Sequence, residues 1–336
     1  MTTTPTRTLG KAGPEFNAIG LGCWAIGGPF TFEGKPDGWG TVDDAESIRA
    51  INRAVDLGVT LFDTADAYGT GHSERVLGEA LRGRRHDVVI ATKFGYTYDE
   101  VRREITGVDV SPAYVRRACA ASLARLETDY IDLYQLHVGD IDAATADDVF
   151  AALEDLVDEG KIRGYGWSTD DPDGARRLAG RRRAVAVQFS LNILSDARGM
   201  LTACDESDLT GLIRTPLAMG LLTGKFDARS RLPADDVRGS GHSWVTYFRD
   251  GRPDADSLDR LAAIREILTS GGRTLAQGAL AWILARSPRI APIPGFKSLA
   301  QAAENAAALD HGPLTPAQLT EIDALLDRRP GPPLNE

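Results

Sequence analysis

Short apolar runs alternate with longer amphipathic stretches along most of the chain. Eight of the runs are rich in Val, Ile and Leu and have the length of buried strands: 19–23, 60–63, 88–92, 131–135, 162–166, 185–188, 211–214 and 290–293. Strands that alternate with helices are typical of repeated βα units and a parallel sheet. Eight such strands are the number that closes a barrel, so the pattern predicts a (β/α)8 TIM barrel.

Helix signals flank several of the amphipathic stretches. The predicted starts are Asp43 with Asp44, Ser73 with Glu74, Ser111 with Pro112, and Thr274. Gly58 follows the first stretch and is predicted to stop that helix, because glycine readily adopts the left-handed backbone of a helix end.

Three further segments complete the predicted fold. The segments RTLG and EFNAIG flank residues 11–14 and predict a small hairpin on the barrel floor, and residues 315–326 predict an extra C-terminal helix. Residues 227–256 are rich in Gly, Pro and Asp but contain three aromatic residues, which favours a lid over an open pocket. The predicted class is α/β: one TIM-barrel domain over residues 1–336 with an N-terminal β-hairpin and an extra C-terminal helix.

Composition narrows the range of partners. The 336 residues carry a formal charge of −10, and Lys and Arg are scattered, so neither nucleic acid nor an anionic membrane is an expected partner. The three cysteines are far apart, which argues against a disulfide framework or a metal site and fits a reducing, cytoplasmic setting. The first 13 residues lack the apolar core of a signal peptide, and no run is long enough to span a membrane. No coiled-coil heptads are visible, and a monomer is favoured.

Four polar residues stand near the ends of three successive predicted strands. They are Asp63 and Tyr68 in LFDTADAYG, Lys93 in VVIATKFG, and His137 in IDLYQLHVGD. Parallel strands would bring all four to one rim, where barrel enzymes place their catalytic groups. Taken singly, each residue could instead have a purely structural role. Asp63 could cap a loop, Tyr68 could pack in one, Lys93 could form a buried ion pair, and His137 could be a hydrogen-bonded structural histidine.

Together the four side chains fit the reduction of a carbonyl group. The reaction needs a proton donor, and a phenol with a pKa of about 10 is too weakly acidic unless a nearby ammonium lowers that pKa. Lys93 can do this beside Tyr68, and Asp63 can hold Lys93 charged and in position. A neutral His137 can donate a hydrogen bond that orients the carbonyl.

The chain resembles the aldo-keto reductase family, in its bacterial-type, NADPH-dependent form, over essentially its whole length. The similar segments, in order, are FDTADAYGTGHSERVLGEAL, VVIATKFG, YIDLYQLH, TPLAMGLLTGKF and PIPGFKSLAQAAEN. The resemblance implies an eight-stranded barrel, NADPH bound in extended form, and the tetrad Asp63, Tyr68, Lys93 and His137 as the catalytic residues.

The resemblance also implies a set of residues that bind NADPH or NADP⁺. They are Ser168 and Gln188 at the nicotinamide carboxamide, Pro216, Leu217, Gly220, Leu222 and Lys225 over the pyrophosphate, and Gly295, Lys297, Gln301, Glu304 and Asn305 at the adenosine end. Glycine allows close backbone approach and a helix N-terminus favours phosphate. Lys297 is expected at the 2′-phosphate, which favours NADPH over NADH; a solvated lysine at a helix start is the alternative.

Two positions depart from the family pattern. Thr169 stands where relatives commonly have Asn, so one contact to the carboxamide is expected to be lost. Arg214 stands where the family commonly has an aromatic residue that stacks on the nicotinamide. A guanidinium can stack on a ring but repels an oxidised, positively charged nicotinamide, so Arg214 is expected either to disfavour NADP⁺ or to pair with an acidic residue away from the ring.

Four aromatic residues are expected to line the substrate pocket: Trp24, Phe94, Tyr96 and Trp244. Such a wall suits a mostly apolar or ring-containing aldehyde or ketone. The arginines leave an anionic substrate open, including a nucleotide-linked keto sugar.

The resemblance favours an NADPH-dependent carbonyl reductase that also oxidises alcohols in reverse. A lyase or hydrolase on a similar barrel is a second hypothesis, and a Schiff-base enzyme that uses Lys93 is its specific form. A third is a non-catalytic NADPH-binding sensor or regulatory subunit, because some proteins that resemble this family are channel subunits.

Overall fold

The structure is a computed structural model that describes residues 5–328. Residues 1–4 and 329–336 lie outside this range. The predictions for the first residues of the chain and for a domain over all of 1–336 therefore lie partly outside the described residues.

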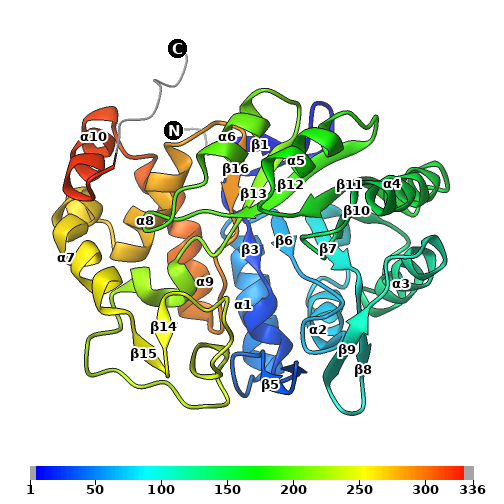
Figure 1. Ribbon diagram of the computed structural model, residues 1–336, viewed down its shortest axis with the longest axis horizontal. Helices are drawn as coiled ribbons and strands as arrows, with labels where there is room; N and C mark the ends of the chain where they lie inside the picture. The colour runs from blue at the N-terminus through cyan, green and yellow to red at the C-terminus, as the bar shows by residue number, and fades with distance from the viewer. Residues whose placement is uncertain (1–4, 329–336) are drawn as a thin grey trace.

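Eight parallel strands form one sheet that closes on itself (Figure 1). The strands are β3 (Leu21–Gly22), β6 (Leu61–Asp63), β7 (Val89–Phe94), β10 (Ile131–Leu136), β11 (Ile162–Ser168), β12 (Ala184–Ser190), β13 (Thr210–Arg214) and β16 (Ile290–Pro292). Each pairs with its neighbour in chain order, and the segment after β16 meets β3 through the bridge between Gly22 and Gly295. The predicted (β/α)8 barrel and all eight strands are confirmed, with shifts of a few residues at their ends.

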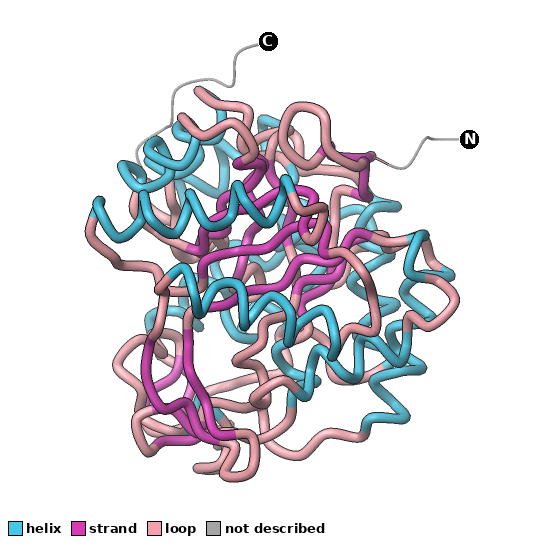
Figure 2. Tube along the Cα trace, turned by 90° about the vertical axis from the view of Figure 1, so that its right-hand side faces the viewer, coloured by secondary structure: helices cyan, strands magenta, loops and turns pink. Residues whose placement is uncertain are grey.

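Helices surround the barrel, as Figure 2 shows, and separate its strands in sequence. The α-helices are α1 (Asp44–Asp56), α2 (His72–Ala80), α3 (Pro112–Arg125), α4 (Ala143–Asp158), α5 (Pro172–Ala179), α6 (Arg198–Asp205), α7 (Ala255–Thr269), α8 (Leu275–Leu284), α9 (Leu299–Ala306) and α10 (Pro316–Leu325). Short 3-10 helices are η1 (Trp24–Gly27), η2 (Arg85–Asp87), η3 (Ala218–Thr223), η4 (Val237–Gly239), η5 (Ser270–Gly272) and η6 (Ala307–His311).

Three of the four predicted helix starts are side-chain caps. Asp43, Ser111 and Thr274 each accept hydrogen bonds from the first free backbone amides of α1, α3 and α8. The expectation for Ser73 is wrong, because α2 begins at His72 and the Ser73 hydroxyl instead donates to the backbone oxygen of Cys23, at 2.7 Å. This bond ties the start of α2 to the loop after β3.

The N-terminal hairpin closes the amino-terminal end of the barrel. Its strands are β1 (Thr6–Thr8) and β2 (Glu15–Asn17). Leu9 and Phe16, both 1% exposed, pack with side chains from inside the barrel, including Leu61 and Leu133. The predicted floor hairpin and the C-terminal helix, which is α10, are therefore both confirmed, and the interior is filled from below.

Two smaller sheets lie beyond the barrel. One has four strands in the order β5 (Lys35–Pro36), β4 (Thr31–Phe32), β9 (Glu104–Val108) and β8 (Tyr96–Asp99), and the other is the hairpin of β14 (Phe248–Arg249) and β15 (Arg252–Pro253). The backbone amide of Val237 donates to Gly38 at 2.9 Å, which joins the 227–256 loop to the segment after β5. These additions build walls around the barrel mouth.

Candidate active site

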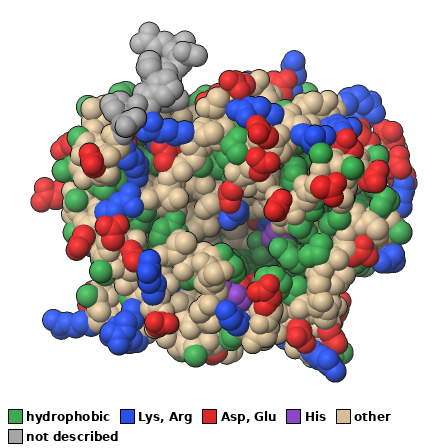
Figure 3. Space-filling model, in the orientation of Figure 1, with side chains coloured by type: hydrophobic (Ala, Val, Ile, Leu, Met, Phe, Trp, Pro, Cys, Tyr) green, Lys and Arg blue, Asp and Glu red, His purple; other side chains and the backbone are tan. Residues whose placement is uncertain are grey.

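A cavity of about 1030 Å³ opens at the carboxyl ends of the barrel strands. Figure 3 shows the hollow near the middle of this face, with hydrophobic and charged side chains around it. Strand ends such as Asp63, Ser168, Gln188 and Arg214 line its base, and the 227–256 loop contributes Trp244 to its wall. The predicted catalytic rim is therefore the floor of a large cavity.

Lys93 connects two of the other candidate catalytic residues. Its ammonium donates to Asp63 Oδ2 at 2.6 Å, to the backbone oxygen of Thr64 at 2.9 Å and to the Tyr68 hydroxyl at 3.2 Å. The Lys93 side chain is completely buried and Asp63 is almost so. These three acceptors use the whole hydrogen-bonding capacity of an ammonium group, so its position is fully determined.

A pair of amides holds the other oxygen of Asp63. Gln188 Nε2 donates to Asp63 Oδ1 at 2.8 Å and Gln135 Nε2 donates to the same atom at 3.2 Å. Gln135 is buried and was not expected to contribute. The sequence could have placed Gln135 inside the barrel, because it alternates with Leu133 and His137 and every second side chain of a barrel strand points inward.

The pKa of Tyr68 departs from the expectation. Burial raises it above its ordinary value, and the Lys93 ammonium, which lowers it, does not offset the burial. Burial also opposes the charge on Lys93, yet the pKa of Lys93 is raised because Asp63 and Tyr68 both favour the ammonium form. The site therefore holds a protonated phenol beside a charged lysine.

His137 stands against the ring of Tyr68. The ring centroids are 5.7 Å apart with an interplanar angle of 83°, and the Tyr96 ring lies 5.2 Å away on another side. Burial, with Lys93 and Arg214, lowers the pKa of His137 well below its usual range. The imidazole is therefore neutral at pH 7, as predicted, and its buried Nδ1 has no hydrogen-bond partner among residues 5–328.

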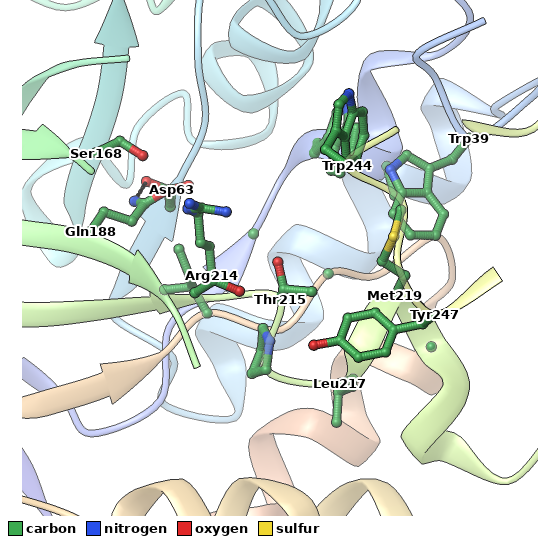
Figure 4. A pocket seen from close by; sticks show the side chains of 18 of the residues that line it. Trp39, Asp63, Ser168, Gln188, Arg214, Thr215, Leu217, Met219, Trp244 and Tyr247 are labelled. Atoms are coloured by element: carbon green, nitrogen blue, oxygen red, sulfur yellow. Dashed lines mark hydrogen bonds between the residues drawn. The ribbon is translucent and has the colours of Figure 1, made fainter. Parts of the chain in front are cut away.

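Arg214 faces the cavity but is paired. Its guanidinium forms an ion pair with Asp170, whose other oxygen accepts from the Ser190 backbone amide at 2.8 Å. The expected pairing of Arg214 with an acidic residue is confirmed, and the effect of its charge on NADP⁺ stays a prediction, because the guanidinium also lines the cavity. Figure 4 shows Arg214 beside Asp63, Ser168 and Gln188. The Thr169 hydroxyl donates to the backbone oxygen of Gly139 at 2.8 Å, and the expected loss of a contact to the carboxamide stays a prediction.

The loop after β13 lines the middle of the cavity with a tight backbone. Gly220 adopts a φ of 92°, a left-handed value that favours glycine. Pro216, Leu217, Gly220 and Lys225 line the cavity, whereas Leu222 is completely buried and is not among the lining residues. Leu222 therefore supports this loop from behind.

Arg238 also lines this region and was not expected. Its guanidinium forms an ion pair with Asp236 at 2.6 Å and lies 4.6 Å from the ring centroid of Trp39. Burial, followed by Arg238, lowers the pKa of Lys225. No sequence signal marked Arg238, because its position depends on the folding of the long loop.

The residues around α9 form the far end of the cavity. Gly295, Lys297, Gln301, Glu304 and Asn305 all line it. The Lys297 ammonium donates to the backbone oxygens of Trp39 and Thr41, at 2.7 and 3.0 Å, and no carboxylate pairs with it among the described residues. The Gln301 side chain accepts from the Lys297 backbone amide at 2.7 Å. A cation beside a helix start is suited to a phosphate group.

Three of the four aromatic residues expected in the substrate wall line the cavity: Trp24, Tyr96 and Trp244. The expectation for Phe94 needs correction, because it is fully buried and stacks on Tyr134 with centroids 4.6 Å apart. Adjacent strand residues point to opposite faces, so an inward Lys93 requires an outward Phe94. Trp39 and Met219 line the cavity in addition, on the side that Figure 4 shows opposite Asp63.

The family comparison agrees with this arrangement. Residues 18–327 match the model of the Aldo/keto reductase family, so the chain belongs to that family and to the oxidoreductases. It is similar to an aldo-keto reductase of Schizosaccharomyces pombe whose name specifies NADP⁺, with 32% identity over 91% of this chain and 86% of the relative.

Solved structures show the same likeness. A glycerol dehydrogenase from Gluconobacter oxydans is 28% identical, with a TM-score of 0.82 over 100% of both chains. An aldo-keto reductase from Klebsiella pneumoniae, solved in complex with NADP and acetate, is 28% identical, with a TM-score of 0.73 over 97% of both chains.

Other kinds of site were not found in the described part of the chain. Residues 5–328 contain no cluster of His, Cys, Asp and Glu that could hold a metal ion. Within the same residues no helix is both long and apolar enough to cross a membrane. All three cysteines are buried and free.

Proposed function

We propose that the protein reduces an aldehyde or a ketone to an alcohol with NADPH, and catalyses the reverse oxidation with NADP⁺. The observation that carries this proposal is the position of Lys93, hydrogen-bonded to both Asp63 and Tyr68 at the cavity floor. When bound, the reduced nicotinamide supplies the hydride that the carbonyl carbon accepts.

Tyr68 is the proposed proton donor. Its hydroxyl keeps its proton at neutral pH and gives it to the carbonyl oxygen as the carbon gains the hydride. The charged Lys93 then stabilises the phenolate, and Asp63 keeps Lys93 charged. The neutral His137, whose ring faces Tyr68, is proposed to donate a hydrogen bond that orients the carbonyl oxygen.

The cavity residues fit an extended dinucleotide. Ser168, Gln188 and Arg214 would contact the nicotinamide end, and the loop that carries Pro216, Leu217, Gly220 and Lys225 would follow the pyrophosphate, with Leu222 behind it. Lys297 and Gln301, with Gly295, Glu304 and Asn305, would hold the adenosine end. The relatives with NADP⁺ in their descriptions support this cofactor.

The contacts of Lys93 also bear on the alternatives. A Schiff base requires a neutral amine that can reach the substrate, whereas Lys93 is completely buried and its pKa is raised. A sensor without catalytic activity would not need this arrangement beneath its cavity.

We further propose that residues 1–336 act as one catalytic unit, monomeric and cytoplasmic. The three free, buried cysteines support a reducing setting. Light scattering after gel filtration would test the monomer.

The test is NADPH oxidation across a panel of aldehydes, ketones, α-dicarbonyls and keto sugars, with Tyr68→Phe in parallel. Turnover that is lost in the variant while NADPH binding survives supports the proposal. Tight NADPH binding without turnover on the whole panel would favour the sensor, and no NADPH binding would contradict the cofactor.

A further inference from the structure

A carboxyl group with one buried oxygen lines the cavity wall. Asp37 follows β5, and its side chain is 15% exposed. The buried Oδ1 has no hydrogen-bond partner among residues 5–328, and the ring nitrogen Nε2 of His242 lies 3.5 Å from it. A buried carboxyl in this state is under-satisfied, since hydrogen bonds normally offset its loss of hydration.

The Trp24 ring connects the backbone of Asp37 to the proposed proton donor, and two further indoles pack on Trp24. Trp24 donates from its indole nitrogen to the Asp37 backbone oxygen at 3.1 Å, and its ring stacks on Tyr68 with centroids 6.0 Å apart. Trp39 also meets Trp24, edge-on with ring centroids 5.3 Å apart, and the Trp244 ring lies 6.0 Å from that of Trp24. One indole therefore separates the Asp37 backbone from the reacting centre.

Two loops hold Asp37 in this position. His242, from the long loop, contacts the backbone oxygen of Pro36 at 3.2 Å, and Lys35 donates to the backbone of Gly241 at 2.9 Å. The Asp37 backbone amide donates to Phe30 at 2.9 Å. Because Oδ1 is buried, the part of the Asp37 carboxyl that can meet a ligand in the cavity is Oδ2.

A carboxyl beside aromatic faces matches the surface of a hydroxylated carbon chain. The rings cover its C–H groups, and the carboxyl oxygens accept hydrogen bonds from its hydroxyls. We propose that Asp37 is a specificity-determining residue that accepts hydrogen bonds from a polyhydroxylated aldehyde or ketone. This inference rests on the proposed carbonyl reduction and refines the apolar substrate expected from the aromatic wall alone.

The environment favours a hydroxyl over a cationic group. Burial raises the pKa of Asp37 to about 7, so a substantial fraction of the carboxyl is neutral near pH 7 and can donate as well as accept a hydrogen bond. Burial lowers the pKa of His242, which therefore supplies no fixed positive charge. A neutral carboxyl can exchange hydrogen bonds with a hydroxyl, whereas it offers no charge to a quaternary ammonium group.

The test compares kcat/KM for glyceraldehyde and propanal in the wild type, Asp37→Leu and Asp37→Asn. Asp37→Leu is expected to lower the value for glyceraldehyde by about 10-fold to 100-fold and that for propanal by less than about threefold, because only the hydroxylated substrate loses hydrogen bonds. Asp37→Asn, which keeps an acceptor, is expected to show a smaller loss. Glu33→Gln removes a carboxylate of the same segment that does not line the cavity, and should leave the ratio unchanged.

Two outcomes would overturn the inference. An unchanged ratio in Asp37→Leu would mean that the carboxyl does not meet the hydroxyls. A larger loss for betaine aldehyde than for glyceraldehyde would mean that the site binds a cation. Thermal unfolding shows whether Asp37→Leu is folded. If it is not, the change in the glyceraldehyde-to-propanal ratio in Asp37→Asn decides whether the carboxyl meets the hydroxyls.

A second readout separates this inference from the proposed function. Saturation-transfer NMR of xylitol with the unaltered protein should show binding that is lost in Asp37→Leu. If the wild type reduces neither aldehyde, the proposed reduction fails, and the xylitol experiment still decides for or against the polyol site.

Discussion

The Lys93 ammonium lies 2.6 Å from a carboxylate oxygen of Asp63, and both side chains are withdrawn from solvent. Such a pair is costly to break, because the remaining charge is left buried. The same ammonium also reaches the Tyr68 hydroxyl. Removal of either partner is therefore expected to affect both the stability of the barrel and the proposed chemistry.

Replacing Lys93 with Met separates these two effects. Lys93→Met is expected to lower the free energy of unfolding by about 3–5 kcal/mol, because Asp63 loses its partner. The value of kcat should fall by about 10²-fold to 10⁴-fold, the range for loss of acid catalysis. Denaturant unfolding and NADPH oxidation measure the two quantities.

The double variant Asp63→Asn/Lys93→Met is the control. With both charges removed, most of the stability should return while kcat stays low. A double variant less stable than Lys93→Met alone would show that the buried charges are not the source of the loss.

Replacing Lys297 with Met should affect NADPH and NADH differently. If Lys297 meets the 2′-phosphate, KM for NADPH should rise by about 10-fold to 100-fold, in line with loss of a charge-assisted hydrogen bond, and KM for NADH should change by less than about threefold. Lys297 also joins the 39–41 segment to α9 through backbone oxygens.

Lys35→Met provides a matched control, since Lys35 likewise bonds a loop backbone oxygen, that of Gly241. Equal increases in KM for both cofactors in Lys297→Met would assign Lys297 to loop structure alone.

Arg214→Tyr should tighten NADP⁺ by about threefold to tenfold relative to NADPH, as measured by calorimetry. The charge of the guanidinium opposes that of the oxidised nicotinamide, and its pairing with Asp170 reduces the effect. Asp170→Asn, which leaves Arg214 unpaired, should change the ratio in the opposite direction. If Arg214→Tyr alters both affinities equally, the charge does not act on the nicotinamide.

His137 should make stability depend on acidity. Its pKa is lowered in the folded protein, so below the unfolded value of about 6.5 the unfolded chain binds a proton that the native state does not. Stability therefore falls as the pH drops below about 6.5, by at most about 1.4 kcal/mol per pH unit from this residue.

The measurement is the difference in unfolding free energy between the wild type and His137→Asn from pH 7.5 to pH 5.5. Using the difference cancels the contributions of other titrating groups. A difference that is constant across this range would mean that His137 titrates normally in the native state.

The barrel could be predicted because each of its strands is a local apolar run. The short strands β4 and β5 could not be predicted, because they pair with each other, β4 also pairs with β9 about 70 residues away, and neither carries a pattern of its own. Long-range pairing of this kind is set by the surrounding loops.

The residues of the candidate site likewise divide into those that the local sequence can place and those whose position depends on distant segments. The tetrad follows strand ends in sequence, so parallel pairing alone brings it together. Phe94 could have been placed correctly by its alternation with Lys93, and Gln135 by its alternation with His137. Asp37 and Arg238 could not, because their burial depends on the 227–256 loop folding back over the barrel mouth.

The most direct test of the central claim uses NADPH deuterated at the transferred position of the nicotinamide, with mass spectrometry of the alcohol formed from an accepted carbonyl substrate. The wild type should place one deuterium on the carbinol carbon, and Tyr68→Phe should bind the same cofactor and form little product. Alcohol without deuterium, or full activity in Tyr68→Phe, would contradict hydride transfer with Tyr68 as the proton donor.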